Sequence, residues 1–165
     1  INKVIGIFKA YTTRVGSGPF PSEIFDDIGE KISRVGNEFG ATTGRARRCG
    51  WLDLVSLKYA VDINGVTELA IMKSDVMSGI NKIKVCTAYT QFGKEISRMP
   101  FSLNSASISP IYSEFDGWNE DITNIKSESQ LPINLKKYIL FIEKKLGVPI
   151  KIISVGPKRD QTIYR

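Results

Sequence analysis

Glu68-Leu69-Ala70-Ile71-Met72, followed at once by Lys73-Ser74-Asp75, is the stretch that decides the fold class. Its first five residues form a short, mostly apolar run of the kind found in buried strands. The polar triplet comes directly after that run, and in open α/β sheets ligands bind at the carboxyl ends of the strands. The stretch therefore predicts an α/β fold with a candidate site at the end of this strand.

Upstream of this strand, the chain shows one strand pattern and two helix patterns. Residues 3–15 mix β-branched and aromatic side chains, as a buried strand does. Ser22 is expected to cap a helix that Gly36 ends. Residues 53–62 predict a second helix, which Asn64-Gly65 stops. The apolar residues of the first helix recur at helical spacing and are Ile24, Phe25, Ile28, Ile32 and Val35.

Downstream, residues 82–115 change to a pattern of short strands. Residues 82–89 alternate with a period of two, and Gln91-Phe92-Gly93-Lys94 has the composition of a hairpin turn. Residues 108–115 predict another strand. We therefore expect a small antiparallel β insertion at about 82–115.

The last part of the chain returns to an α/β pattern. After a polar, irregular stretch, residues 135–146 give the strongest helix pattern, which Gly147 and Pro149 stop. Residues 150–154 predict a final strand. The whole pattern indicates a single α/β domain over residues 1–165, with a mixed sheet covered by helices.

Composition limits the classes of function that are possible but does not select one of them. The chain carries 23 Lys and Arg against 17 Asp and Glu, a formal charge of +6 that favours phosphorylated or polyanionic ligands. No apolar run approaches the roughly 18 residues of a membrane-spanning helix, so no membrane span is expected. Without a histidine, these residues alone cannot complete a reaction that needs an imidazole base.

Two further observations concern the chain as a polypeptide. It begins at Ile1, directly inside a strand-like run, which whole proteins rarely do. We therefore expect a fragment of a longer protein. Cys49 and Cys86 suffice for neither a metal cluster nor a disulfide framework, so free thiols are expected.

A second candidate site is the stretch from Gly40 to Asp53, which holds three arginines within residues 45–48 and two threonine hydroxyls just before them. Glycines let a ligand approach the main chain, and arginine presents a planar fork that matches carboxylate or phosphate oxygens. Trp51 and Leu52 anchor the exit of the loop to a core. An anion-binding loop and a solvated basic turn are the two interpretations, and the anchored exit favours the first.

The strand-end triplet offers chemistry of a different kind. A carboxylate at Asp75 has the geometry to accept the N1–H and the exocyclic amine of guanine, while the stem of Lys73 lies against the base. The alternative is an ordinary surface charge pair, which the spacing alone does not exclude. The turn after the last strand, Ser154 to Pro157, is a second segment whose backbone would close over a base.

Taken in order, several segments together resemble the carboxyl-terminal part of the adenylosuccinate synthetase family, over essentially the whole chain. The segments are Tyr11-Thr12-Thr13-Arg14-Val15-Gly16, Gly18-Pro19-Phe20-Pro21-Ser22-Glu23, Gly36-Asn37-Glu38-Phe39-Gly40-Ala41-Thr42-Thr43-Gly44-Arg45, Arg47-Arg48-Cys49-Gly50-Trp51-Leu52-Asp53, Lys73-Ser74-Asp75 and Ile153-Ser154-Val155-Gly156-Pro157. The resemblance implies the carboxyl-terminal portion of a mixed sheet like that of P-loop NTPases.

The resemblance also implies the ligands. The family uses GTP and magnesium to phosphorylate the 6-oxygen of IMP, and L-aspartate then displaces the phosphate to give adenylosuccinate. Arg45 would also serve IMP, Arg47 would also reach the GTP phosphates, and Ala46 departs from the arginine common in the family. The implied aspartate and IMP residues are Ala41, Thr42, Thr43, Gly44, Arg45, Ala46 and Arg47. The implied GTP residues are Arg47, Lys73, Ser74, Asp75, Ser154, Val155 and Gly156.

The resemblance also implies that several functional parts of the family lie outside this chain. The family's phosphate-binding glycine-rich loop, its catalytic aspartate and histidine, and most contacts to IMP and magnesium belong to the amino-terminal part. No catalytic residue and no metal ligand is therefore expected here, and the fragment alone should not turn over. The resemblance further implies a cytoplasmic homodimer that binds neither a membrane nor nucleic acid.

Two rival interpretations stay open. The charge and the arginine loop also suit a freestanding module that binds RNA or another polyanion, although no RNA-binding motif is present. The other rival is a structural domain without ligand affinity, because its phosphate site lies elsewhere.

Overall fold

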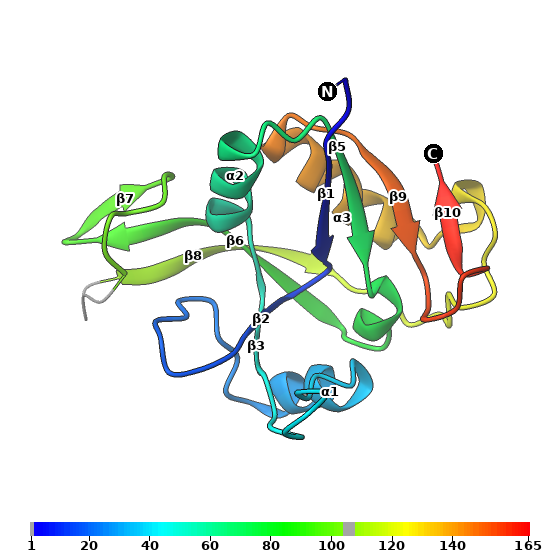
Figure 1. Cartoon of the computed structure of the whole chain (residues 1–165), viewed down its shortest axis with the longest axis horizontal. Coiled ribbons are helices and arrows are strands. Elements are labelled where there is room, and N and C mark those ends of the chain that lie inside the picture. Colours follow the sequence, from blue (N-terminus) through cyan, green and yellow to red (C-terminus); the bar gives the residue numbers. More distant parts are fainter. Residues whose placement is uncertain (1, 104–107) are drawn as a thin grey trace. The chain divides into compact units, whose positions relative to one another are not determined.

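The computed structural model describes residues 2–103 and 108–165, which form two compact units (Figure 1). The first unit contains the described residues of Ile1–Ala10, Leu57–Ile83 and Phe115–Arg165, and the second those of Tyr11–Ser56 and Lys84–Glu114. Each unit is described by itself. Both mix helices with strands, which confirms the predicted α/β class, and whether they make the single domain expected over residues 1–165 stays a prediction.

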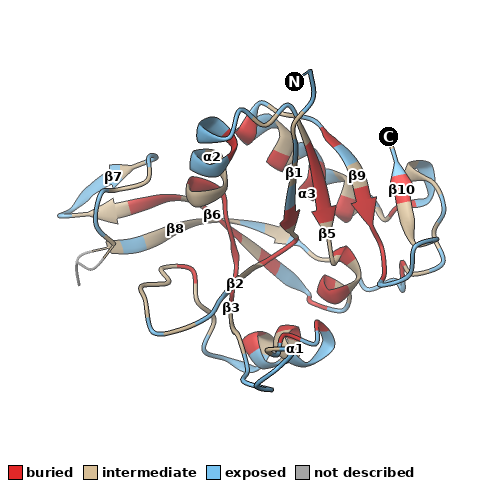
Figure 2. Cartoon of the chain, in the orientation of Figure 1, coloured by how far each residue is buried: buried red, intermediate tan, exposed pale blue. Residues whose placement is uncertain are grey.

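The first unit is built on a four-stranded sheet in the order β1-β5-β9-β10. β1 (Ile5–Lys9), β5 (Glu68–Met72) and β9 (Ile150–Ser154) run parallel, and β10 (Thr162–Tyr164) is antiparallel to β9. The inner strands β5 and β9 are the most buried of the four (Figure 2). The strands predicted at 68–72 and 150–154 are therefore confirmed.

α3 (Ile133–Leu146) supplies much of the core of this unit. The Tyr138 hydroxyl donates a hydrogen bond to the Ala10 carbonyl over 2.8 Å, and its ring lies 5.8 Å from that of Trp118. Gly147, with φ of +70°, ends the helix in the left-handed conformation that glycine favours. The buried residues of α3 are Leu135, Tyr138, Ile139, Ile142 and Leu146, which confirms the predicted helix.

α2 (Leu54–Ile63) also begins and ends nearly where predicted. Asp53 Oδ1 accepts hydrogen bonds from the backbone N–H groups of Val55 and Ser56 at 3.0 and 3.1 Å, which makes Asp53 its N-terminal cap. Two short 3₁₀ turns, η1 (Ser74–Met77) and η2 (Glu128–Gln130), complete the helical elements of the described residues. No helix there combines the length and apolar character of a membrane span.

The second unit contains α1 (Asp27–Val35) and two small sheets. β2 (Thr12–Arg14) pairs antiparallel with β3 (Arg48–Gly50). β4 (Leu52–Asp53) pairs in parallel with β6 (Lys82–Gln91), which in turn pairs with β7 (Lys94–Ile96) and β8 (Ile108–Asp116). Because β4 follows β3 directly, these pairings fix the chain that leaves the arginine-rich stretch.

The insertion predicted at about 82–115 corresponds to β6, β7 and β8. β6 and β7 form the expected antiparallel hairpin, and Phe92 and Gly93 at its turn have φ of +51° and +75°. Positive φ at both central residues is the backbone of a two-residue hairpin turn. The parallel pairing of β6 with β4 was not predicted.

Residues 3–15 do not form one buried strand, so that prediction is wrong. β1 ends at Lys9 and β2 begins at Thr12, and each joins a different sheet. β1 lies at the edge of its sheet, which leaves the side chain of Ile7 75% exposed. An edge strand rich in β-branched residues has the same sequence pattern as a buried one.

The predicted start of the first helix is also wrong. Asp26, not Ser22, caps α1, because its Oδ1 accepts a hydrogen bond from the Ile28 N–H at 2.9 Å. Ser22 is buried, and its carbonyl accepts a hydrogen bond from the Trp51 N–H at 2.9 Å. Phe25 consequently lies outside the helix and is 88% exposed. β10 was not predicted at all, since three residues after a loop give no usable period.

Candidate functional site

The arginine-rich stretch folds into a closed loop, which we call the arginine loop (residues 39–47). Phe39 and Ala46 face each other in an antiparallel bridge at its base. The Gly40 N–H donates to the Arg45 carbonyl at 2.9 Å, and the Gly44 N–H donates to the Gly40 carbonyl at 2.8 Å. Gly44 has φ of +65°, where a β-carbon would be strained. The backbone of the loop is therefore set by its own hydrogen bonds.

Arg48, the last arginine of the stretch, anchors the exit of this loop. Its guanidinium pairs through two nitrogens with the Glu23 carboxylate and donates to the carbonyls of Gly16 and Gly18 at 2.9 and 2.6 Å. It also lies 5.5 Å from the centre of the Phe20 ring. Hydrogen bonding to Glu23 raises the pKa of Arg48 further above its usual value. The internal partners of Arg48 identify it as a structural residue.

Arg47, one position earlier, pairs with a different acid. Its Nη1 donates to Glu38 Oε2 at 2.8 Å, while the Tyr11 hydroxyl donates to Glu38 Oε1 at 2.6 Å. Glu38 is fully buried, whereas about a third of the Arg47 side chain stays exposed. Arg47 therefore presents part of its guanidinium to solvent from a fixed base.

The remaining predicted loop residues face solvent. Ala41, Thr42, Thr43, Gly44, Arg45 and Ala46 are all exposed. The Arg45 N–H donates to the Thr43 hydroxyl at 3.4 Å, but the Arg45 guanidinium has no partner among the residues that the structure describes. An exposed guanidinium beside two hydroxyls, on a backbone with fixed hydrogen bonds, is suited to bind a carboxylate.

The second group of predicted residues meets at one edge of the sheet of the first unit, and we call it the strand-end corner (residues 73–75 and 154–156). β5 and β9 are parallel neighbours with Ile71 beside Ile153, so their following residues leave the sheet at the same edge. Lys73 has φ of +60°, a left-handed conformation that turns the chain sharply from β5 into η1. The structure thus brings the two predicted segments together.

Asp75 lies in η1 and is half-buried. Burial raises the pKa of its carboxyl above the usual value, while the nearby charge of Lys73 and backbone N–H groups act in the opposite direction. Ser74 beside it is fully buried, and its hydroxyl has no hydrogen-bond partner among the described residues. A half-buried carboxylate at the end of a strand is a suitable acceptor for paired N–H donors of a ligand.

The turn after β9 is closed by its own contacts. The Ser154 hydroxyl donates to the Gly156 carbonyl at 3.0 Å, and the Val155 N–H donates to the Gln161 carbonyl at 2.9 Å. A β-carbon on Gly156 would lie 2.3 Å from Gln161 Oε1, so the Gln161 side chain would have to move to admit any larger residue there. Residues 154–156 are buried and form a rigid wall of backbone.

Sequence reasoning missed the acids that hold the arginines. Glu38 and Glu23 both lie within the quoted motif segments, but a buried partner 9 or 25 residues from its arginine has no local pattern. Tyr11 was likewise taken as a strand residue. The only available signal was the density of arginines, since buried or half-buried guanidinium groups need acidic partners.

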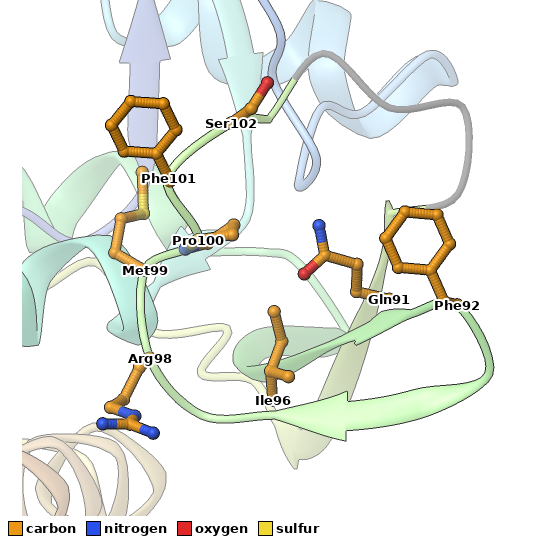
Figure 3. Close-up of a pocket in the computed structure, with 8 residues that line it drawn as sticks. All are labelled: Gln91, Phe92, Ile96, Arg98, Met99, Pro100, Phe101 and Ser102. Carbon is orange, nitrogen blue, oxygen red and sulfur yellow. The ribbon is translucent and has the colours of Figure 1, made fainter.

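Two cavities of the described residues lie apart from both groups of predicted residues. One of them, of about 560 Å³, lies beside the β6–β7 hairpin and is lined mainly by apolar residues (Figure 3). A smaller one of about 120 Å³ lies beside Asp53, whose carboxylate accepts a hydrogen bond from the Tyr89 hydroxyl. Neither cavity is lined by a predicted site residue. The residues that line the 560 Å³ cavity are Gln91, Phe92, Ile96, Arg98, Met99, Pro100, Phe101 and Ser102.

Cys49 and Cys86 are buried and are not joined in a disulfide, in line with the expected thiols. Burial raises the pKa of the Cys86 thiol to about 12. Within residues 2–103 and 108–165, no group of three or more Cys, Asp or Glu side chains is suited to hold a metal ion.

Comparison with known proteins assigns the family. The adenylosuccinate synthetase family model matches residues 1–163. The adenylosuccinate synthetases of Flavobacterium psychrophilum and Christiangramia forsetii are 61% and 60% identical over all 165 residues. The chain spans only 39% of the length of each.

Comparison with a solved structure gives the same family. It is described as fully ligated adenylosuccinate synthetase from Plasmodium falciparum, with a TM-score of 0.95 and 40% identity, and it is matched over 100% of this chain and 40% of its own. This match confirms the predicted fold class, and the family match rests on almost every residue rather than on one motif. The chain belongs to the adenylosuccinate synthetase family.

Proposed function

We propose that this chain is the part of an adenylosuccinate synthetase that recognises L-aspartate and the guanine base of GTP. In the reaction, the γ-phosphoryl group of GTP passes to the 6-oxygen of IMP. The amine of aspartate then attacks C6, inorganic phosphate leaves, and adenylosuccinate forms. GTP, IMP and L-aspartate are the proposed ligands of the full-length protein, which we expect to act as a cytoplasmic homodimer.

The observation that carries the proposal is the contrast between the three arginines of one short stretch. Arg48 has most of its donors satisfied by the protein, Arg47 is partly exposed, and Arg45 has no partner among the described residues. Family membership supports assigning the two outward-facing arginines to ligands. We assign Arg45, with Thr42 and Thr43, to the carboxylates of aspartate, and Arg45 also to IMP.

Arg47 is assigned to the phosphates of GTP. Phosphoryl transfer depends on positive charge at the developing phosphate oxygens more than on covalent chemistry. A partly exposed guanidinium held by Glu38 supports that role, since its donors are oriented before the ligand arrives. Ala41, Gly44 and Ala46 contribute backbone to the same loop.

The strand-end corner is assigned to guanine. Asp75 accepts the N1–H and the exocyclic amine, the stem of Lys73 covers the base, and Ser74 lies between them. Ser154, Val155 and Gly156 close the pocket with backbone, and the rigid turn at Gly156 supports this. Adenine would leave the Asp75 carboxylate unpaired, and such sites discriminate by roughly 10⁴ or more.

Magnesium, when bound, would neutralise charge on the GTP phosphates. The described residues contain no carboxylate cluster for it, so we assign no metal ligand to this chain. The chain also has no histidine, and we propose that it is inactive alone, with the base that deprotonates IMP outside it.

The direct test is product formation by the full-length protein that carries these residues. Adenylosuccinate should form only when IMP, GTP and L-aspartate are all present, and the 165-residue chain should form none. Product formation with ATP in place of GTP would contradict the guanine assignment.

The rival polyanion-binding interpretation is tested by titrating the chain with an oligonucleotide at several salt concentrations. Binding that weakens steeply with salt, together with no nucleotide-dependent ligation by the full-length protein, would favour the rival. We expect no such binding, because the arginine loop presents few free cations.

A further inference from the structure

The acid that holds Arg47 is the most unusual polar residue of the second unit. Glu38 has no exposed surface, and its two carboxylate oxygens accept from two different residues, Tyr11 and Arg47. Removing a carboxylate from water is costly unless it is paired and hydrogen-bonded. The protein meets that cost for Glu38 directly before the arginine loop.

Three separate segments converge to build this arrangement. The Arg47 N–H donates to the Glu38 carbonyl at 2.8 Å, so the two residues are paired through the backbone as well as the side chains. A β-carbon on Gly36 would lie 2.4 Å from the Tyr11 hydroxyl oxygen, so glycine at this helix end lets the hydroxyl approach. A backbone hydrogen bond therefore joins Glu38 to Arg47 on one side, and Gly36 leaves room for the Tyr11 hydroxyl on the other.

The neighbouring Arg48 shows what an arginine used only for structure looks like here. It has a bidentate acid and two carbonyl acceptors, and these partners occupy most of its donors. Arg47 has one side-chain acceptor among the described residues, through Nη1, and a third of its side chain is exposed. Its remaining N–H groups are thus held in one orientation and left available.

We propose that Glu38 and Tyr11 are positioning residues for Arg47, which fix the direction of its free N–H donors toward the phosphates of a guanine nucleotide. The proposal rests on the proposed function, because it takes the phosphate role of Arg47 from there. Glu38 touches no ligand in this account; it orients the guanidinium, and the Tyr11 hydroxyl orients Glu38.

The decisive experiment is a double-mutant cycle in the full-length protein, with kcat and the KM values for GTP and aspartate as readouts. Glu38→Gln keeps the shape of the side chain but removes the charge that holds Arg47. We expect it to lower kcat about tenfold, the size of one hydrogen bond to a charged group, with little change in the KM for aspartate. In an Arg47→Leu background, the same change should have almost no further effect.

Tyr11→Phe provides a second variant that keeps the buried ring and removes only the hydroxyl. It should lower kcat about threefold, since it removes the hydrogen bond from the Tyr11 hydroxyl to the carboxylate, and this loss should also vanish in the Arg47→Leu background. Glu23→Gln is the matched control, because it breaks a comparable ion pair on Arg48. Its effects, mainly on thermal stability, should be the same with and without Arg47.

The outcomes distinguish the phosphate role of Arg47 from the positioning role of Glu38 and Tyr11. If Arg47→Leu leaves kcat and the KM for GTP unchanged, the phosphate role of Arg47 is wrong and the inference falls with it. If Arg47→Leu impairs GTP use but Glu38→Gln lowers kcat equally in both backgrounds, only the positioning role is overturned. Loss of the effect in the Arg47→Leu background supports both.

Discussion

The arginine loop positions its polar groups through side chains, whereas the strand-end corner positions them through the backbone. At the loop, buried Glu38 holds Arg47 and Glu23 holds Arg48 just after it, while residues 41–46 face solvent. In the corner, parallel pairing of β5 and β9, the left-handed Lys73 and the close contact at Gly156 fix the groups.

The difference determines what each region tolerates. Exposed side chains on a closed loop are replaceable without loss of packing, so substitutions there should affect ligand use and spare stability. Buried groups on strand ends share their contacts with the core, so backbone changes there should affect both. The same protein thus binds a small dicarboxylate and a base, in our proposal, by two physically distinct strategies.

The largest expected effect on ligand use, and so the strongest test of this comparison, comes from a substitution at the strand-end corner. Asp75→Asn should move nucleotide preference from guanine toward xanthine, because an amide donates where the carboxylate accepts. The change in the ratio of kcat/KM for GTP and XTP should approach the roughly 10⁴ expected for an unpaired buried polar group. Steady-state kinetics of the full-length protein with both nucleotides measure it.

A control for that variant is Asp160→Asn in the same unit. Asp160 is an exposed acid paired with Lys126, and the pairing lowers the pKa of its carboxyl. Asp160→Asn makes the same charge change at a residue outside the strand-end corner as defined, residues 73–75 and 154–156. Unchanged GTP preference in Asp75→Asn would remove Asp75 from guanine recognition.

The loop should give the next largest effect. Arg45→Leu should weaken aspartate use by about 2–5 kcal/mol if the guanidinium pairs with a carboxylate. The melting temperature should barely change, because the Arg45 side chain is exposed and has no partner among the described residues. Kinetics with varied aspartate and a thermal unfolding scan test the two statements.

Arg34→Leu supplies the matched control, since Arg34 is an exposed arginine in the last turn of α1. It removes the same charge from the same unit. A KM for aspartate that stays normal in Arg45→Leu would contradict the assignment of the loop.

A smaller effect on stability should follow from Gly156→Ala. The added β-carbon would lie 2.3 Å from Gln161 Oε1, and Gln161 is held by the Lys158 N–H and the Thr123 carbonyl. Forcing these groups apart should cost about 1–3 kcal/mol and raise the KM for GTP. Chemical denaturation measures the first quantity.

Removing the Gln161 side chain, which the new β-carbon would meet, provides the control for this variant. The double variant Gly156→Ala, Gln161→Ala should recover part of the stability relative to Gly156→Ala alone. Equal stability of Gly156→Ala and the unsubstituted protein would show that the turn is not rigid.

The last prediction concerns stability rather than ligand use, and it involves the core behind the exit of the arginine loop. Cys86 pairs in register with Asp53, and burial raises the pKa of its thiol from 9.0 to about 12. Because the folded protein favours the neutral thiol, this stabilisation is complete below pH 9 and is lost as the pH rises toward 12. The loss is at most about 1.4 kcal/mol for each pH unit in that window.

Denaturation of the unsubstituted chain and of Cys86→Ala between pH 9 and 12 tests this. The slope of the free energy of unfolding against pH should be shallower in the variant. A steeper slope in Cys86→Ala would mean that the thiolate, not the thiol, is favoured in the fold.

Prediction from sequence succeeded where local chemistry decides structure. The run from Glu68 to Met72 is a central strand, and the triplet after it lies at a sheet edge beside the turn after β9. The helix at 53–62 was predictable because an Asp cap and a Gly stop are local features.

Prediction failed where distant residues decide. Ser22 is drawn into a contact with Trp51 that no local pattern reveals, and so the cap passes to Asp26. Glu38 was invisible as a partner of Arg47 because buried pairs follow the fold rather than the sequence period. The residues that we propose to face ligands were chosen from motifs, but the acids that hold Arg47 and Arg48 had no such motif.

The central claim is that the two regions serve two different substrates, and a single kinetic matrix tests it. Full-length Arg45→Leu and Asp75→Asn variants would each be assayed for the KM of aspartate and of GTP under identical conditions. We predict that Arg45→Leu raises mainly the KM for aspartate and that Asp75→Asn raises mainly the KM for GTP. If both variants changed the same parameter, the division of the substrates between the arginine loop and the strand-end corner would be wrong.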